Sequence, residues 1–104
     1  MTLHGLDISE DHLTACCRRW KIREFALFGS VLRDDFGPDS GVDCLVEFAP
    51  DADWSLLDVI RAEQELAELL GRPVDLVEKP VVEKSENWLR RRSILQSART
   101  IYAG

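Results

Sequence analysis

Two groups of residues in this chain have the chemistry to bind a phosphate chain together with a cation. The first is Gly29-Ser30, which follows an apolar run and precedes a short stretch of helical character. Glycine lets a ligand approach the backbone, and the free amides at the start of a helix attract phosphate. Arg33 follows about one turn later, so its guanidinium can point toward the same anion. Taken alone, the pattern also fits an ordinary turn with a helix cap.

The second group is a pair of aspartates inside apolar segments. Asp43 lies within the segment 42–46 and Asp75 within the segment 74–77. A carboxylate in such a run is costly to bury unless it is paired or binds a cation. If the two segments are neighbouring strands, the carboxylates could share a hard cation such as magnesium. The alternative is that both lie at strand ends and face water.

The elements that must position these residues can be predicted from hydrophobic periodicity and breaker residues. We expect a helix capped by Ser9 and running to about residue 19, and strands over 22–28, 42–48 and 74–77, the last ended by Pro80. A short helix over 31–35 and a turn over 36–41 follow the first strand. A longer helix runs from 54 or 55 to 70, where Gly71 stops it. A last helix from about 85 carries five apolar residues along one side, Trp88, Leu89, Leu95, Ala98 and Tyr102. This order predicts an α/β (α+β) sandwich around a short sheet with about four helices, forming one domain over residues 1–104.

Composition limits the classes of partner. The net charge of −6 and the pI near 4.8 argue against non-specific binding of DNA or RNA, whereas a small anion needs only a local positive pocket. No apolar run approaches the length of a membrane span, and residues 1–10 do not resemble a signal peptide, so we expect a cytoplasmic protein. Cys16, Cys17 and Cys44 have no metal-ligand or disulfide spacing and are expected to be small buried or half-buried thiols.

The spacing of these features resembles the minimal nucleotidyltransferase family of the DNA polymerase beta superfamily. That family's signature is Gly-Ser, ten residues, then Asp-x-Asp, with a third aspartate on a later strand. The matching segments here are GSVLRDDFGPDSGVDCLVEF and RPVDLVEK. The resemblance extends over nearly the whole chain and implies the nucleotidyltransferase fold, with a short mixed sheet.

The resemblance also implies roles for individual residues. Gly29, Ser30 and Arg33 would bind the nucleotide, with ATP as the substrate. Asp43 and Asp75 would be catalytic and would bind Mg²⁺. The implied activity is transfer of AMP to a protein hydroxyl, and the implied partner is a HEPN-domain protein, the toxin of a toxin–antitoxin pair in which this chain is the antitoxin.

The chain departs from the signature at Gly41, where the family has the first aspartate of its pair. Asp39 or Glu47 could supply the missing carboxylate, or glycine could simply suit the turn that enters the strand. The alternative to an enzyme is therefore a catalytically impaired nucleotide- or partner-binding module that neutralises a toxin by complex formation. Homodimers are a further option for the exposed apolar surface of so small a domain. The run Arg90-Arg91-Arg92 is interpreted as solvated arginines covering apolar neighbours such as Trp88, or as a strip that contacts a protein partner.

Overall fold

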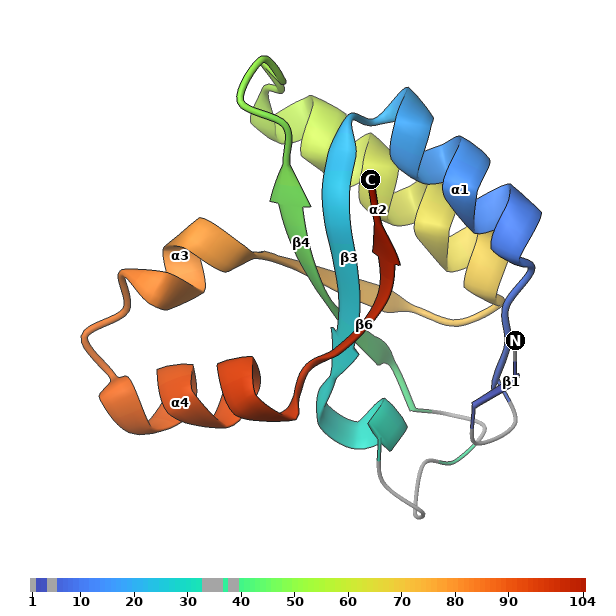
Figure 1. Ribbon diagram of the computed structural model, residues 1–104. Helices are drawn as coiled ribbons and strands as arrows, with labels where there is room; N and C mark the ends of the chain where they lie inside the picture. Colours follow the sequence, from blue (N-terminus) through green and yellow to red (C-terminus); the bar gives the residue numbers. More distant parts are fainter. Residues whose placement is uncertain (1, 4–5, 33–36, 38–39) are drawn as a thin grey trace.

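The structure is a computed structural model that describes residues 2–3, 6–32, 37 and 40–104, apart from the side chains of Leu3 and Ser30. It has a central sheet with two helices on each face (Figure 1). In chain order the elements are β1 (Thr2–Leu3), β2 (Leu6–Asp7), α1 (Glu10–Arg19), β3 (Ile22–Phe28), the 3₁₀ helix η1 (Gly29–Leu32), β4 (Val42–Phe48), α2 (Leu56–Leu70), β5 (Val74–Glu78), α3 (Lys79–Glu83), α4 (Trp88–Ser97) and β6 (Arg99–Ala103).

The main sheet has four strands in the order β5-β4-β3-β6 and is mixed, as predicted. Strand β3 pairs antiparallel with both β4 and β6, whereas β4 pairs parallel with β5. A parallel pair needs a crossover, and here α2 provides it. The two shortest strands, β1 and β2, form a separate antiparallel pair that the sequence did not predict.

Local sequence signals fix the ends of helices α1 and α2. The Ser9 hydroxyl accepts a hydrogen bond from the backbone N–H of His12 and caps α1. Ser55 and Asp58 form a reciprocal capping box at the start of α2. Gly71 ends α2 in the left-handed conformation, with φ of 69°. The predicted cap at Ser9 and the predicted stop at Gly71 are confirmed, and α2 begins within two residues of its predicted start at 54 or 55.

The alternation of side chains along the strands divides the core between the two faces of the sheet. One face packs against α1 and α2 and forms the larger cluster, which includes Leu13, Phe25, Leu27, Val42, Cys44, Val46 and Leu66. The other face packs against α3 and α4 through Ala26, Phe28, Leu45, Val82 and Ile94. All three cysteines are buried and free, as expected.

The prediction of a last helix from about Ser85 through Tyr102 is wrong at both ends. Helix α4 is shorter, and the chain then continues as the edge strand β6, in which Tyr102 pairs with Phe25. The β-branched and aromatic residues of β6 favour a strand once β3 offers a free edge. Trp88 and Leu89 do not lie in the core either: 55% and 63% of their surface is exposed.

Two other segments differ from prediction. Strand β5 ends at Glu78, just before Pro80, and is followed by α3, a short helix that was not predicted. Pro80 lies in the first turn of α3, where proline is well tolerated. After β3 the chain forms η1 rather than a helix beginning at Val31. Residues 33–35 of the predicted helix and residues 36, 38 and 39 of the predicted turn lie outside the described residues. None of the helices described here is long and apolar enough to cross a membrane.

Candidate functional site

The two candidate aspartates lie side by side at the start of neighbouring strands. Asp43 on β4 and Asp75 on β5 are direct partners in the parallel register. Because side chains alternate, they lie on the same face as Leu45 and Val77, which is the face covered by α3 and α4. Asp43 is half-buried and Asp75 is exposed. The structure therefore brings together the two carboxylates that the sequence singled out.

Gly29 lies against the first of these carboxylates. It follows Phe28, which pairs with Asp43 across the antiparallel β3–β4 ladder. Its φ is 78°, in the left-handed region that favours glycine. A Cβ at this position would overlap Asp43 Oδ2 and would lie 3.3 Å from Asp43 Cγ. Only glycine thus allows the backbone to turn this close to the acid pair.

Electrostatics at the pair favour the arrival of a cation. Burial raises the pKa of Asp43 above its ordinary value, and the neighbouring charge of Asp75 raises it further, while the charge of Arg90 acts in the opposite direction. A cation between the two carboxylates would relieve their repulsion. Magnesium usually binds one or two carboxylates together with substrate phosphates, so the two acids fit that ion. In the part of the chain that is described, no set of three His, Cys, Asp or Glu residues could enclose a metal without substrate.

The backbone at Gly41 does not require glycine. Its φ lies outside the left-handed region, and a Cβ there would meet Pro73 O at 3.5 Å and Pro73 Cβ at 4.0 Å, which are ordinary contacts. Gly41 directly precedes β4, and residues two apart along an extended backbone point to the same side, so we expect an aspartate at position 41 to point to the side on which Asp43 lies. The turn into β4 therefore gives no conformational reason for the missing carboxylate.

Neither alternative acid replaces it in the structure. Asp39 lies outside the described residues. Glu47 is on β4 but pairs with Glu24 toward the other end of the strand. Four residues of extended chain separate Glu47 from Asp43 by roughly 13 Å. Glu47 is too far away to share an ion with Asp43.

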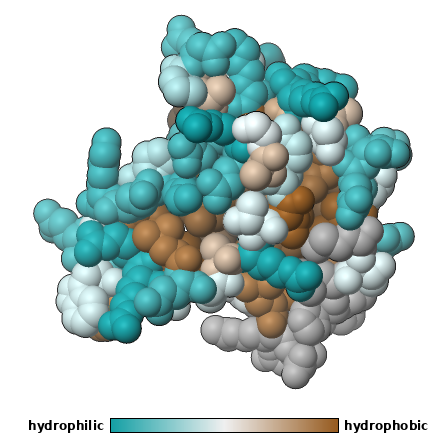
Figure 2. All heavy atoms as spheres, in the orientation of Figure 1, coloured by the Kyte–Doolittle hydropathy of each residue, from teal (hydrophilic) through white to brown (hydrophobic). Residues whose placement is uncertain are grey.

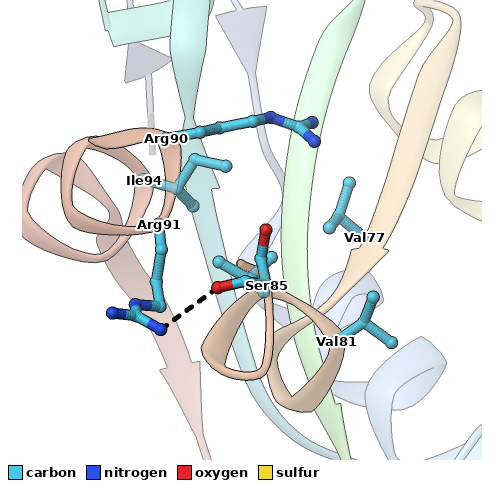
Figure 3. Close-up of a pocket in the computed structure, with 7 residues that line it drawn as sticks. Val77, Val81, Ser85, Arg90, Arg91 and Ile94 are labelled. Carbon is cyan, nitrogen blue, oxygen red and sulfur yellow. Dashed lines mark hydrogen bonds between the residues drawn. The ribbon is translucent and has the colours of Figure 1, made fainter. Parts of the chain in front are cut away.

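The three consecutive arginines have three different environments, which the sequence interpretation missed. Arg91 is partly buried and donates to the backbone oxygen of Ser85 over 3.1 Å (Figure 3). Arg92 is exposed. Arg90 points from α4 across toward the sheet, where its charge acts on Asp43 (Figure 3). Arg90 therefore belongs to the candidate site rather than to a uniform solvated strip beside Trp88.

Two cavities between α4 and its neighbours meet at Arg90 and Ile94. Figure 2 shows apolar surface between α3, α4 and the sheet, bordered by hydrophilic side chains. The cavity of about 350 Å³ reaches the turn after β3 and is lined by Phe28, Gly29, Leu32, Arg90, Ser93, Ile94 and Ser97. The cavity of about 190 Å³ lies over β5 and α3 and is lined by Val77, Val81, Val82, Ser85, Arg90, Arg91 and Ile94. The larger cavity is within the range of about 300–1,000 Å³ that is typical of small-molecule sites.

The remaining predicted site residues are placed only in part. Ser30 follows Gly29 within η1, so its backbone lies at the edge of the larger cavity, but its side chain is not described. Arg33 lies outside the described residues. The described site thus consists of the Gly29 turn, the acid pair and Arg90.

Comparisons with known proteins agree with this fold. The sequence profile named nucleotidyltransferase domain matches residues 9–101. The protein adenylyltransferase MntA of Thermococcus cleftensis is 46% identical over 80 residues, which cover 76% of this chain and 79% of that protein. The chain belongs to the nucleotidyltransferase domain family.

Solved structures share the fold. A crystal structure of a toxin–antitoxin with AMP-PNP matches with a TM-score of 0.69 and 20% identity, covering 93% of this chain and 75% of the matched chain. A structure of a tri-AMPylated HEPN toxin of Shewanella oneidensis in complex with MNT antitoxin matches with a TM-score of 0.60 and 21% identity, covering 91% and 70%. At these identities the likeness establishes the nucleotidyltransferase fold of this chain.

Proposed function

We propose that this chain is a protein adenylyltransferase that transfers AMP from ATP to a hydroxyl group of a partner protein. The observation that carries the proposal is the pairing of Asp43 with Asp75 beside the left-handed turn at Gly29. An acid pair next to a backbone turn that is open to phosphate matches what nucleotidyl transfer with a divalent cation requires. The name of the Thermococcus cleftensis relative supports the choice of AMP and of a protein acceptor.

Different residues of the site would bind the phosphate chain and the metal ion. The turn at Gly29 and Ser30 would hold the phosphate chain, with Arg33 as a further cationic contact. Asp43 and Asp75 would hold Mg²⁺ between the protein and the phosphates. When bound with the nucleotide, Mg²⁺ supplies Lewis-acid polarisation of the phosphate oxygens and offsets the charge that develops on them.

The transfer step is an in-line displacement at the α-phosphorus. The acceptor oxygen forms a bond to this phosphorus while the bond to the bridging oxygen of pyrophosphate breaks, and pyrophosphate leaves. Asp75 would accept the hydrogen bond of the acceptor hydroxyl and take its proton. Asp75 is suited to this role because it is the exposed member of the pair and can be reached from outside.

A protein acceptor is supported by the surface around the site. Val81 on α3 and Trp88 and Leu89 on α4 expose 64%, 55% and 63% of their surface. Large apolar side chains on the helices that flank a site are typical of a protein-binding surface. The toxin–antitoxin structures with the same fold support a HEPN-domain toxin as this partner, with the present chain as its antitoxin.

Gly41 favours a second candidate function, a binding module that neutralises its partner by complex formation with little or no transfer. Loss of a group that only hydrogen-bonds to a metal ligand typically lowers metal affinity or activity by about 10–100-fold, and loss of a metal ligand itself should cost at least as much. Since a Cβ at position 41 meets only ordinary contacts, the missing carboxylate can be restored without disturbing the fold.

The two candidates are separated by one transfer assay. The chain and its Gly41→Asp variant are incubated with Mg²⁺, ATP labelled at the α-phosphate and a HEPN-domain protein as acceptor, and label on that protein is measured. Transfer by the unmodified chain, increased about 10–100-fold by the aspartate, supports the enzyme. Transfer by the variant alone supports the binding module. A variant that also carries Asp75→Asn is the control, and transfer that survives it would refute the site itself.

A further inference from the structure

Arg90 lies where a phosphate chain held by the Gly29 turn would extend. Among the described residues that line the cavity of about 350 Å³, Arg90 is the charged one, and Gly29 forms part of the same wall. The other polar groups there belong to Ser93 and Ser97, and the remaining lining residues are apolar. A guanidinium that shares a partly apolar cavity with a glycine turn is suited to an anionic ligand.

The guanidinium of Arg90 is available for such a ligand. No ion pair or side-chain hydrogen bond ties it within residues 2–3, 6–32, 37 and 40–104. The adjacent Arg91 is different, because it donates to the backbone oxygens of Ser85 and Glu83 and so stabilises the connection between α3 and α4. An arginine has five N–H donors and can bind two phosphate oxygens at once.

The position of α4 lets Arg90 face the acid pair without forming an ion pair with it among the described residues. The first turn of α4 is fixed by Asn87, whose side-chain oxygen accepts a hydrogen bond from the backbone N–H of Arg90 over 3.2 Å. Ile94, one turn later, is buried against the sheet and anchors the same side of the helix. The first turn of α4 is thus fixed between Asn87 and Ile94, and the long side chain of Arg90 extends from it toward the acid pair.

We propose that Arg90 binds the phosphate chain of the nucleoside triphosphate and holds it over Asp43 and Asp75. This inference rests on the proposed function, because it assumes that a nucleotide occupies the site. In the nucleotide-free protein the charge of Arg90 partly offsets that of the acid pair. When the nucleotide binds with its cation, Arg90 pairs with phosphate oxygens instead, since the cation takes over the neutralisation of the two carboxylates.

The test compares Arg90→Gln with Arg92→Gln, a matched substitution on a second exposed arginine of the same helix. Calorimetry measures binding of Mg²⁺–AMP-PNP, of Mg²⁺–tripolyphosphate and of Mn²⁺ alone. We expect Arg90→Gln to weaken both phosphate ligands by about 10–100-fold, the loss of one or two charge-assisted hydrogen bonds. Mn²⁺ alone should bind as tightly as before or more tightly, because a positive charge near the acids has been removed. Arg92→Gln should change none of the three.

Each other outcome overturns the inference. A merely structural role for Arg90 would weaken Mn²⁺ binding together with the phosphate ligands. A loss confined to AMP-PNP, with tripolyphosphate unaffected, would place Arg90 on the nucleoside rather than on the phosphates. Equal binding by Arg90→Gln and the unmodified chain would refute the role of Arg90 but leave the proposed function intact. Failure of the unmodified chain to bind Mg²⁺–AMP-PNP would instead refute the proposed function.

Discussion

Replacing Gly29 by alanine perturbs the site at its most constrained point. Gly29 has a φ of 78°, and the added Cβ would overlap Asp43 Oδ2. The backbone strain of a non-glycine residue in this region costs roughly 1–2 kcal/mol, and the lower entropy of the unfolded chain with alanine offsets about 0.4–1 kcal/mol of it. Rotating Asp43 away from its rotamer costs about 0.5–1.5 kcal/mol more. The free energy of unfolding should therefore fall by about 2 kcal/mol.

Gly71→Ala provides a matched control. Gly71 has a similar φ of 69°, but a Cβ at this position would have nothing within 4 Å. The substitution Gly71→Ala should therefore lower the free energy of unfolding only by the net backbone strain, about 1 kcal/mol. Gly71 ends α2 and is not part of the site, so its substitution should leave ligand binding unchanged.

Urea unfolding measures the two stabilities, and calorimetry measures binding of Mg²⁺–AMP-PNP by the folded proteins. We expect Gly29→Ala to weaken binding by about 10-fold or more, because Asp43 can no longer hold its position beside the turn. Gly71→Ala should bind like the unmodified chain. If both variants lose stability but bind equally well, the close approach of Gly29 to Asp43 has no role in the site.

Two further predictions concern the opposite face of the sheet. Burial raises the pKa of Glu65, but hydrogen bonds from Cys16 Sγ and Trp20 Nε1, together with the charge of Arg19, outweigh it and hold the pKa below its ordinary value. Because the folded pKa is lowered, this stabilisation is present above the ordinary pKa of 4.5 and is lost as the pH falls through the folded pKa. Glu65→Ala should therefore reduce the free energy of unfolding by about 1–3 kcal/mol at pH 7 and by much less in acid. Glu68→Ala, at an exposed position of the same helix, is the control. A loss from Glu65→Ala that does not depend on pH, or an equal loss from Glu68→Ala, would contradict this role of Glu65. Burial also raises the pKa of Cys17 to about 12 and raises that of Cys44. Iodoacetamide should label these two thiols, which are 0% exposed, only in step with unfolding, and rapid labelling of the native protein would contradict this packing.

Much of the fold could be predicted because it is encoded locally. The helix caps at Ser9 and Ser55 and the stop at Gly71 depend on a few adjacent residues, so the sequence alone locates them. The acid pair could also be anticipated, because an aspartate within an apolar strand is unusual. The sequence could not establish that Asp43 and Asp75 are in register, which requires β4 and β5 to be neighbours.

The features that escaped prediction depend on tertiary contacts. Strand β6 forms because the edge of β3 is free, and the last residues of the chain carry no turn signal that separates them clearly from the preceding helix. Trp88 looks like a core residue by type but lies on the outer side of α4. Arg90 cannot be told apart from Arg91 and Arg92 in the sequence, since only the placement of α4 over the sheet decides which arginine faces the acids.

The central claim is that Asp43 and Asp75 act together on one ion, and a double-mutant cycle tests it directly. The affinity for Mg²⁺–AMP-PNP is measured for the unmodified chain, for Asp43→Asn, for Asp75→Asn and for the double variant. If the two carboxylates hold a single ion, each substitution alone should weaken binding by about 10-fold or more, and the second should add little to the first. Losses that simply multiply, or a variant that binds like the unmodified chain, would contradict a shared site.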